Sequence, residues 1–430
     1  MVKQALVTRK DFPILLGNFL EFYDFTLFAA LLPIISPILF PSKEIIDSFI
    51  SGYLFLGIAF LARPVGAILF GYIGDHYSRK AALILSILMM SLGTACIGLL
   101  PTYNSIGNYA LVFLALCRFL QGLSAGGEYC GAGLTLTENA HQTVRSSRGA
   151  ILSASGAFGA FAALIVSAMI SLSFFPKESW RILFLMGGCI GLTALWFRLS
   201  MENTRPVQDA STPKAVPWHA LFRTYKVPFL CSISFGALMN VPFYLILGFI
   251  NTYFVATGTY AKTTLMLLNA FIILFCAIMT VLFGLLSRRV DPLKMMFYAS
   301  LGMSLFSFPF FFLVNSGSFG YFIVAQLVLI LLAQMFVAPA FGVMASLLFP
   351  YAIRYRGVAI GESIALALLG GSTPYISAHL IRYTGLAWSP AFYLCVVSIS
   401  GFIAVMVTRK RQQGVQSMNL EPQMVYQGAT

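Results

Sequence analysis

The chain has 430 residues, of which 59% are hydrophobic and only 10% are charged. A soluble core cannot bury that much apolar surface, so lipid must be the solvent for most of it, and a soluble enzyme is excluded. The formal net charge of +13 comes from basic residues dispersed over many loops, without the single basic face that nucleic-acid binding requires.

Twelve apolar stretches follow one another, each long enough to cross a bilayer, which takes about 20 residues. The predicted spans are 12–40, 48–74, 80–100, 109–138, 149–173, 181–199, 227–256, 263–286, 294–314, 319–348, 357–381 and 387–407. A polar, Pro-rich segment separates the sixth span from the seventh, as is typical of a linker. We therefore expect an all-α membrane protein with a six-helix bundle over 1–200, a linker over 201–226, a second six-helix bundle over 227–411 and a short tail over 412–430.

The basic residues are divided unevenly between the two ends of these spans. Of the 27 Lys and Arg residues, 20 fall on the side of the N-terminus, five fall on the opposite side, and Arg63 and Arg118 lie inside spans. Because Lys and Arg concentrate on the cytoplasmic side, both termini are expected in the cytoplasm, with the chain in a bacterial inner membrane. The seven cysteines form no CxxC pair and no grouping with His, so no metal or cofactor is predicted.

The first span carries two acids, Glu21 and Asp24, whose spacing places them on one face of a helix. Asp24 lies roughly 18 Å from the inner end of the span, close to the midplane. Carboxylates inside a membrane are costly and usually functional, which makes this pair the first candidates for carrying protons. The alternative is a structural acid paired with a neighbouring helix. Tyr23, beside them, is a candidate substrate contact.

The second span and the loop after it contain candidate gating residues. Asp75, Arg79 and Lys80 stand in a short connection where charged hydrogen bonds can lock neighbouring helix ends, although a solvated basic turn is the alternative. Arg63 lies deep in the span, and Glu128 is the nearest acid by depth. We expect a structural or gating ion pair between Arg63 and Glu128.

The fourth span places Arg118, Gln121 and Glu128 on a single helix face. Arg118 lies roughly 15 Å deep, so it is expected to meet Asp24 near the midplane. A guanidinium suits a bidentate grip on a substrate carboxylate, and its alternative role is to neutralise Asp24 or Glu21. A carboxylate that is released from this pairing when protonated frees the Arg for a substrate anion.

At the inner end of the fourth span, Glu138 is expected to clamp Arg145 or Arg148. Arg148-Gly149 opens the fifth span, and Arg356-Gly357 opens the eleventh in the same way. Internal repeats of this kind are how many transporters build a midplane site between two bundles.

The second half offers a few polar side chains within its spans. Asn240, Tyr244 and Gln326 are candidates for lining a polar cavity, although each is individually more typical of helix packing. Glu362 is the only acid within these spans and has no basic residue beside it. It is therefore expected to face water, to be protonated or to reach Arg118, and a protonated Glu bonded between helices is the alternative.

Several motifs together resemble the major facilitator superfamily and, within it, the metabolite:H+ symporter family of proline/betaine, citrate, 2-oxoglutarate and shikimate carriers. The matching segments are GNFLEFYDF (17–25), ARPVGAILFG (62–71), GYIGDHYSRK (71–80), RFLQGLSAGGEY (118–129), FPYAIRYRG (349–357) and LLGGSTPYIS (368–377). The resemblance implies proton symport, with Glu21 and Asp24 as carriers. The second-half loop over 284–292 has Arg288 where the family usually has Asp, so its clamp is expected to be missing or rebuilt with Asp291.

These features predict a twelve-helix transporter that rocks two bundles to import a small carboxylate or zwitterion with protons. Its partners are the small-molecule substrate, protons and the lipid bilayer, and it is expected to function as a monomer. No phosphate-binding loop followed by Lys and Ser/Thr is present, so ATP is not the expected energy source. A proton-driven exporter or antiporter, and a nutrient sensor without turnover, are the alternatives.

Overall fold

The computed structural model describes residues 6–39, 45–138, 140–170, 175–201 and 218–427. These residues form helices and no strands, and twelve of the helical segments are long and apolar enough to cross a membrane, which confirms the predicted fold class. The first half, residues 6–201, contains α1 (Phe12–Leu39), α2 (Ile45–His76), α3 (Arg79–Leu99), α4 (Tyr103–Ile106), α5 (Asn108–Glu138), α6 (Gln142–Ile170), η1 (Lys177–Ser179) and α7 (Trp180–Leu199).

The second half, residues 218–427, contains α8 (Trp218–Arg223), α9 (Lys226–Phe243), η2 (Tyr244–Ile250), α10 (Asn251–Ala256), α11 (Lys262–Leu286), α12 (Pro292–Val314), α13 (Phe319–Val343), η3 (Met344–Leu348), α14 (Tyr351–Ile364), η4 (Ala365–Gly370), α15 (Thr373–Thr384) and α16 (Pro390–Gln427). Within the predicted linker, residues 202–217 lie outside the described residues, and the short helix α8 follows them.

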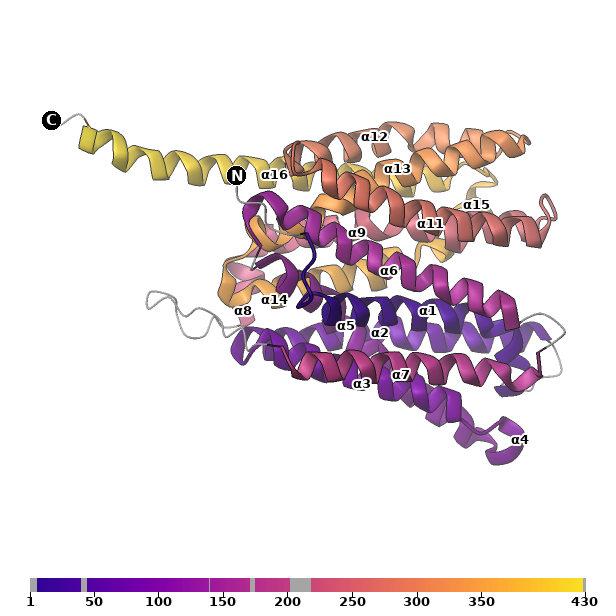
Figure 1. The fold of residues 1–430 in the computed structure, drawn as a ribbon. Coiled ribbons are helices and arrows are strands. Elements are labelled where there is room, and N and C mark those ends of the chain that lie inside the picture. The colour runs from indigo at the N-terminus through magenta and orange to yellow at the C-terminus, as the bar shows by residue number, and fades with distance from the viewer. Residues whose placement is uncertain (1–5, 40–44, 139, 171–174, 202–217, 428–430) are drawn as a thin grey trace.

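Each half packs mainly on itself. In the first half, α2 packs on α5, α3 on α7 and α1 on α6; in the second, α12 packs on α13 and α16, and α9 on α16 and α14. Figure 1 shows α1, α3 and α7 of the first half below α12, α13 and α16 of the second. The halves meet chiefly where α6 contacts α11 and α13, and where α2 contacts α14.

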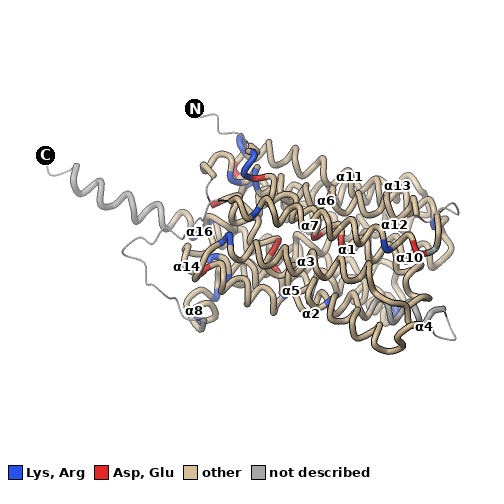
Figure 2. The backbone as a smooth tube through the Cα atoms, turned by 60° about the horizontal axis from the view of Figure 1, so that its bottom comes forward, with Lys and Arg blue, Asp and Glu red and all other residues tan. Residues whose placement is uncertain are grey.

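Both chain ends lie at the same end of the helices, where most of the blue Lys and Arg segments gather in Figure 2. We call this the basic end. It holds the α2–α3 and α11–α12 connections and the starts of α6 and α14. Among the described residues, the connections that the sequence assigns to the side of the N-terminus therefore lie at one end of the molecule.

Three helices depart from their predicted bounds at the basic end. Helix α6 begins at Gln142 instead of 149, and α14 begins at Tyr351 instead of 357. A hydropathy-based prediction places the start of a span where the apolar residues begin. The polar residues before these two starts are nevertheless helical, and among them Arg148 and Arg356 are buried. Helix α16 continues to Gln427, twenty residues beyond the predicted end of its span.

The second half contains three short π-helical segments, in which the backbone hydrogen bond skips one residue further than in an α-helix. They are η2, η3 and η4, and each lies inside or at the end of a membrane-spanning helix. In the described part of the first half, the spanning helices contain no such segment. The two halves therefore differ in how regular their helices are.

Glycines let α2 and α5 approach each other closely. A Cβ atom built on Gly66 would lie 1.9 Å from the carbonyl oxygen of Leu123, and one on Gly126 would lie 2.1 Å from that of Arg63. These distances are far below van der Waals contact, so no larger residue fits without separating the helices. Glycine at these two positions thus permits the close packing of α2 on α5.

Gly66→Ala is therefore expected to lower the free energy of unfolding by about 1–3 kcal/mol, because α2 and α5 must move apart. The midpoint of thermal unfolding in detergent measures the loss. Gly57→Ala is the matched control in the same helix, since a Cβ there meets nothing within 4 Å. It should leave the midpoint unchanged or raise it slightly, because Ala favours helix over Gly. Equal midpoints for the two variants would contradict the packing role.

Candidate functional site

Asp24 of α1 lies in the interior of the first half. Its Oδ1 accepts hydrogen bonds from Thr94 Oγ1 of α3 at 2.8 Å and from Gln121 Nε2 of α5 at 2.6 Å. Its Oδ2 lies 3.3 Å from Nη1 of Arg118, also of α5. All four side chains are fully buried, and we call them the Asp24 cluster. The contact between Arg118 and Asp24 that depth along the helices predicts is present.

The guanidinium of Arg118 is only partly used by the Asp24 cluster. Its Nη1 also donates to Gln121 Oε1 at 2.8 Å, while Nε and Nη2 have no hydrogen-bond partner among the described residues. The rings of Phe28 and Phe25 lie 4.3 and 5.0 Å from its central carbon. The Nε and Nη2 hydrogens point the same way along one edge of the group, which is the geometry that binds a carboxylate through two parallel hydrogen bonds.

Glu21 and Arg63 form a second buried ion pair. Arg63 Nη2 of α2 lies 3.1 Å from Glu21 Oε1, and the ring of Phe25 stacks 4.4 Å from the guanidinium carbon. The predicted pairing of Arg63 with Glu128 is therefore wrong. Depth along a helix axis gives the height of a side chain but not the direction in which it points, and Glu128 points elsewhere.

Glu128 binds Arg198 at the end of α7. Arg198 donates from Nη1 to Glu128 Oε2 at 2.8 Å and from Nη2 to Oε1, and Ser86 Oγ donates to the same carboxylate at 2.6 Å. All three residues are fully buried. Arg198 is in the last turn of a span, and from the sequence alone a cation at that position is expected to face solvent. This ion pair ties α3, α5 and α7 together within the first half.

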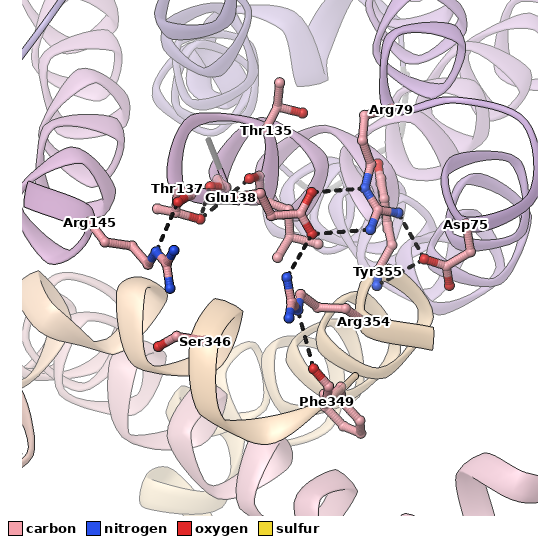
Figure 3. Close-up of polar contacts among 12 residues, drawn as sticks. Asp75, Arg79, Thr135, Thr137, Glu138, Arg145, Ser346, Phe349, Arg354 and Tyr355 are labelled. Atoms are coloured by element: carbon pink, nitrogen blue, oxygen red, sulfur yellow. Dashed lines mark hydrogen bonds and ion pairs between the residues drawn. The ribbon is translucent and has the colours of Figure 1, made fainter. Parts of the chain in front are cut away.

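At the basic end, Asp75 joins the two halves (Figure 3). Its carboxylate accepts from Arg79 Nη1 at 2.8 Å, from Arg356 Nε at 3.0 Å and from the backbone N–H groups of Tyr355 and Arg356 at 3.2 and 3.1 Å. The hydroxyl of Tyr355 also donates to the carbonyl of Gly127 at 2.7 Å. One acid on α2 thus holds α14 of the other half.

Glu138, at the end of α5, forms the second part of the same connection. It accepts two hydrogen bonds from Arg79, at 3.1 and 3.2 Å, and one from Arg354 at 3.3 Å. The predicted clamp of Glu138 on Arg145 or Arg148 is wrong. Arg145 instead donates to two backbone carbonyls. Glu138 faces α3 and α14, so the clamp reaches across the halves.

Arg148 and Lys80 bind within the first half. Arg148 Nη2 lies 2.7 Å from Asp11 Oδ2, which fixes the start of α1 to α6. Lys80 Nζ donates to the carbonyls of Leu199 and Met201 at 2.8 and 2.5 Å, where α7 ends. A cation at a helix C-terminus is stabilised by the unpaired carbonyls there.

In the second half, Glu362 of α14 is 5% exposed, and its Oε1 accepts a hydrogen bond from Asn240 Nδ2 at 3.3 Å. The positive charge of Arg63, in the first half, also acts on Glu362. Glu21 and Glu362 repel each other electrostatically. Arg63 therefore interacts with one acid from each half, by direct contact with Glu21 and through its charge with Glu362.

The remaining candidates are placed in different surroundings. Tyr244 meets Phe60 of α2 across the two halves, edge to face at 6.0 Å between ring centroids. Gln326 is fully buried, and neither end of its amide has a partner among the described residues. Tyr23 donates to the carbonyl of Leu183 at 3.2 Å and so binds α7. In the described part of the chain, neither Gln326 nor Tyr23 forms a hydrogen bond with Arg118.

The α11–α12 loop does not repeat the clamp of the α2–α3 loop. Asp291 accepts a hydrogen bond from the backbone N–H of Leu293 at 2.9 Å and thereby caps α12. The halves are joined here by Ser147 Oγ, which donates to the carbonyl of Gly284 at 2.5 Å. Among the described residues, the missing acid is therefore not replaced by Asp291.

Several members of these networks were not among the predicted site residues. Thr94 gave no signal, because a Thr in an apolar span is most often bonded to its own helix. Arg198, at the end of a predicted span, and Arg354, in a predicted loop, enter the sequence analysis only as basic residues on the side of the N-terminus. A buried acid such as Glu128 needs a cation, and Arg198 at the end of α7 supplies it. The sequence does not show which of several cations is the partner.

A family model described as Major Facilitator Superfamily matches residues 14–372. A Staphylococcus haemolyticus protein named for proline/betaine transport is 33% identical over 407 residues, covering 91% of this chain and 85% of that protein. The proline/betaine transporter of Escherichia coli K12 is 29% identical over 408 residues, covering 90% of this chain and 80% of its own. Among solved structures, the proton:xylose symporter XylE superposes with a TM-score of 0.77 at 13% identity, over 93% of this chain and 94% of that one.

Proposed function

This chain belongs to the major facilitator superfamily, and from that membership we propose that it is a proton-coupled symporter of a small carboxylate or zwitterionic metabolite. It is a multi-pass membrane transporter of a small molecule, as its relatives are, and not an enzyme. The Asp24 cluster is the observation that supports the narrower proposal. It combines an acid, a guanidinium and two neutral hydrogen-bonding groups inside a membrane-spanning bundle.

Arg118 is the proposed anchor for the substrate carboxylate. Its Nε and Nη2 edge has no partner among the described residues, whereas Nη1 is held by Asp24 and Gln121. In this conformation the edge is covered, because the side chain is fully buried against Phe25 and Phe28. A substrate therefore reaches it when these rings turn aside. Gln121, Tyr23, Asn240, Tyr244 and Gln326 are proposed as further contacts.

Proton coupling is proposed to act through Asp24, Glu21 and Glu362. A proton on Asp24 removes its attraction for Arg118 and frees the guanidinium for the substrate anion. The proton and the substrate therefore bind together. Arg63 pairs with Glu21 and its charge acts on Glu362, so a proton on either acid changes how strongly Arg63 attracts the other. The protonation of an acid in one half is thereby coupled to that of an acid in the other half.

Alternating access is proposed to open and close the connection at the basic end. Asp75, Glu138 and their Arg partners join the halves there in this conformation. We assign the basic end to the cytoplasm of a bacterial inner membrane by the positive-inside rule, so this state is closed toward the cytoplasm. The two bundles, residues 1–200 and 227–411, are the proposed rocking units, and the monomer is the proposed functional form.

The test begins with finding the ligand. Thermal-shift measurements on the purified protein should include proline, glycine betaine, organic acids and other amino acids, because a ligand raises the unfolding midpoint by mass action. The active compound is then supplied to proteoliposomes with an imposed pH gradient. Accumulation that requires the gradient, acid outside, supports symport. Uptake driven only by the reverse gradient would indicate an antiporter, and binding without uptake a sensor.

Asp24→Asn and Glu21→Gln are expected to abolish accumulation driven by the pH gradient. Glu362→Gln is expected to remove the pH dependence of transport or to change substrate preference while the protein stays folded. Exchange of labelled for unlabelled substrate without a gradient is the control, because it needs binding and rocking but no net proton movement. If Asp24→Asn and Glu21→Gln both accumulate substrate like the wild type, the proton assignment is wrong.

A further inference from the structure

A cavity of about 440 Å³ lies at the basic end between the two halves. The start of α6 forms one wall, and the α11–α12 loop, the end of α13 with η3, and α16 form the others. Thr143, Arg145 and Ser146 line it from the first half, and Arg288, Arg289 and Asp291 line it from the second. The transport site described above uses none of them.

The cavity has an excess of positive charge. Arg145 comes from the first half, and Arg288 and Arg289 come from the second. The only acid in the lining is Asp291, and its carboxylate is already bonded to the backbone at the start of α12. Arg145 donates to the carbonyls of Thr137 and Ala140, at 3.0 and 3.3 Å, and Figure 3 shows its side chain extending toward Ser346.

None of these three guanidinium groups forms an ion pair with a carboxylate among the described residues. Arg354, outside the cavity, repels Arg145, and Glu138 attracts it. Like charges gathered at a contact between two bodies push them apart unless an anion lies between them. Asp291 supplies one negative charge in the lining against the three arginines.

The contact of α2 with α14, which corresponds to this one in the other half of the repeat, includes an acid that this contact lacks. There Asp75, in the last turn of α2, pairs with Arg356 of the opposite half. The α11–α12 loop carries Arg288 in place of such an acid, and the opposite half presents Arg145. One contact thus has a built-in anion, and the other has cations on both sides of a cavity.

We propose that this cavity binds a phosphate group, either of a free phosphate anion or of a lipid headgroup, and that the bound group holds the basic end closed. Arg pairs with phosphate through parallel, charge-assisted hydrogen bonds, and Thr143 and Ser146 add hydroxyl groups to the same wall. Because the cations come from both halves, the anion binds the closed arrangement more tightly than the open one. It therefore shifts the transporter toward that state.

The test compares the full-length wild type with the double variant Arg288→Gln/Arg289→Gln. Both arginines are exposed, so the variant is expected to fold. Inorganic phosphate is titrated onto each protein in uncharged detergent, with chloride at matched ionic strength as reference. In parallel, each protein is placed in phosphatidylcholine nanodiscs with and without phosphatidylglycerol. The unfolding midpoint is measured throughout, and a phosphate dissociation constant is fitted in detergent.

The wild type is expected to be stabilised by at least one probe, and the double variant should bind at least about tenfold more weakly. A response to inorganic phosphate identifies a soluble anion, and a response to phosphatidylglycerol alone identifies a headgroup. Lys294→Gln is the matched control, because Lys294 is exposed nearby but lies outside the cavity, and it should respond like the wild type. The proposal is overturned if the wild type responds to neither probe, or if the double variant responds equally.

Discussion

Replacing Arg118 by lysine is expected to weaken substrate binding about 100-fold while the protein stays folded. Lysine keeps a positive charge beside Asp24, so the buried carboxylate remains paired. It loses the Nε and Nη2 edge, and two charge-assisted hydrogen bonds at about 1.5–3 kcal/mol each account for a change of that size. The measurement is the dissociation constant of the identified ligand, taken from its stabilising effect on unfolding.

The double variant Arg118→Gln/Asp24→Asn separates the two roles of Arg118. It removes both charges together and leaves neither buried without a partner, which is the usual cause of large destabilisation when one member of a pair is removed. If Arg118 serves only to neutralise Asp24, the double variant and Arg118→Lys should both bind ligand like the wild type. Normal binding by either variant would therefore contradict the proposed carboxylate anchor.

Asp75→Asn is expected to reduce the rate of substrate exchange at least tenfold. The Asp75 side chain is fully buried and accepts four hydrogen bonds, two of them from guanidinium groups. Asparagine has one acceptor oxygen and no charge, so Arg356 loses its carboxylate. Breaking a buried pair in this way costs about 3–5 kcal/mol, which is enough to depopulate the closed basic end. Hydrogen–deuterium exchange of residues 349–357 should become faster.

Asp291→Asn is the matched control in the corresponding loop of the second half. Asp291 caps α12 through the backbone N–H of Leu293, and asparagine caps helices about as well as aspartate. Exchange should stay within about twofold of the wild type, and residues 349–357 should keep their protection. Equal losses for Asp75→Asn and Asp291→Asn would mean that the two loops gate alike, against the asymmetry seen here.

The sequence was sufficient to predict the number and order of the spans, because a run of about twenty apolar residues indicates a membrane-spanning helix. It also predicted the meeting of Arg118 with Asp24, since both lie at the same depth and both belong to helices of the first half. What it could not supply was the rotation of each helix about its own axis. Arg63 was assigned to Glu128 by depth, yet α2 turns it toward Glu21.

Residues at the ends of spans were the other source of error. Arg198, Arg354 and Arg356 follow or precede apolar stretches, where hydropathy gives no sign of burial. Arg198 and Arg356 are buried nonetheless, because a second helix end lies against each of them. Glu138 is bound from two sides by cations far from it in the chain, Arg79 and Arg354. Such partners are fixed by the contact between halves, which no local pattern encodes.

The π-helical segments of the second half also affect how its sequence is to be compared with the first. A π segment accommodates an extra residue within an α-helix, and each α-helical residue corresponds to a rotation of about 100°. An ungapped alignment of the two repeats therefore assigns the residues beyond η2, η3 and η4 to the wrong helix faces. The similarity between the two halves is better traced here through the unbroken stretches, such as those containing Arg148-Gly149 and Arg356-Gly357, than through whole spans.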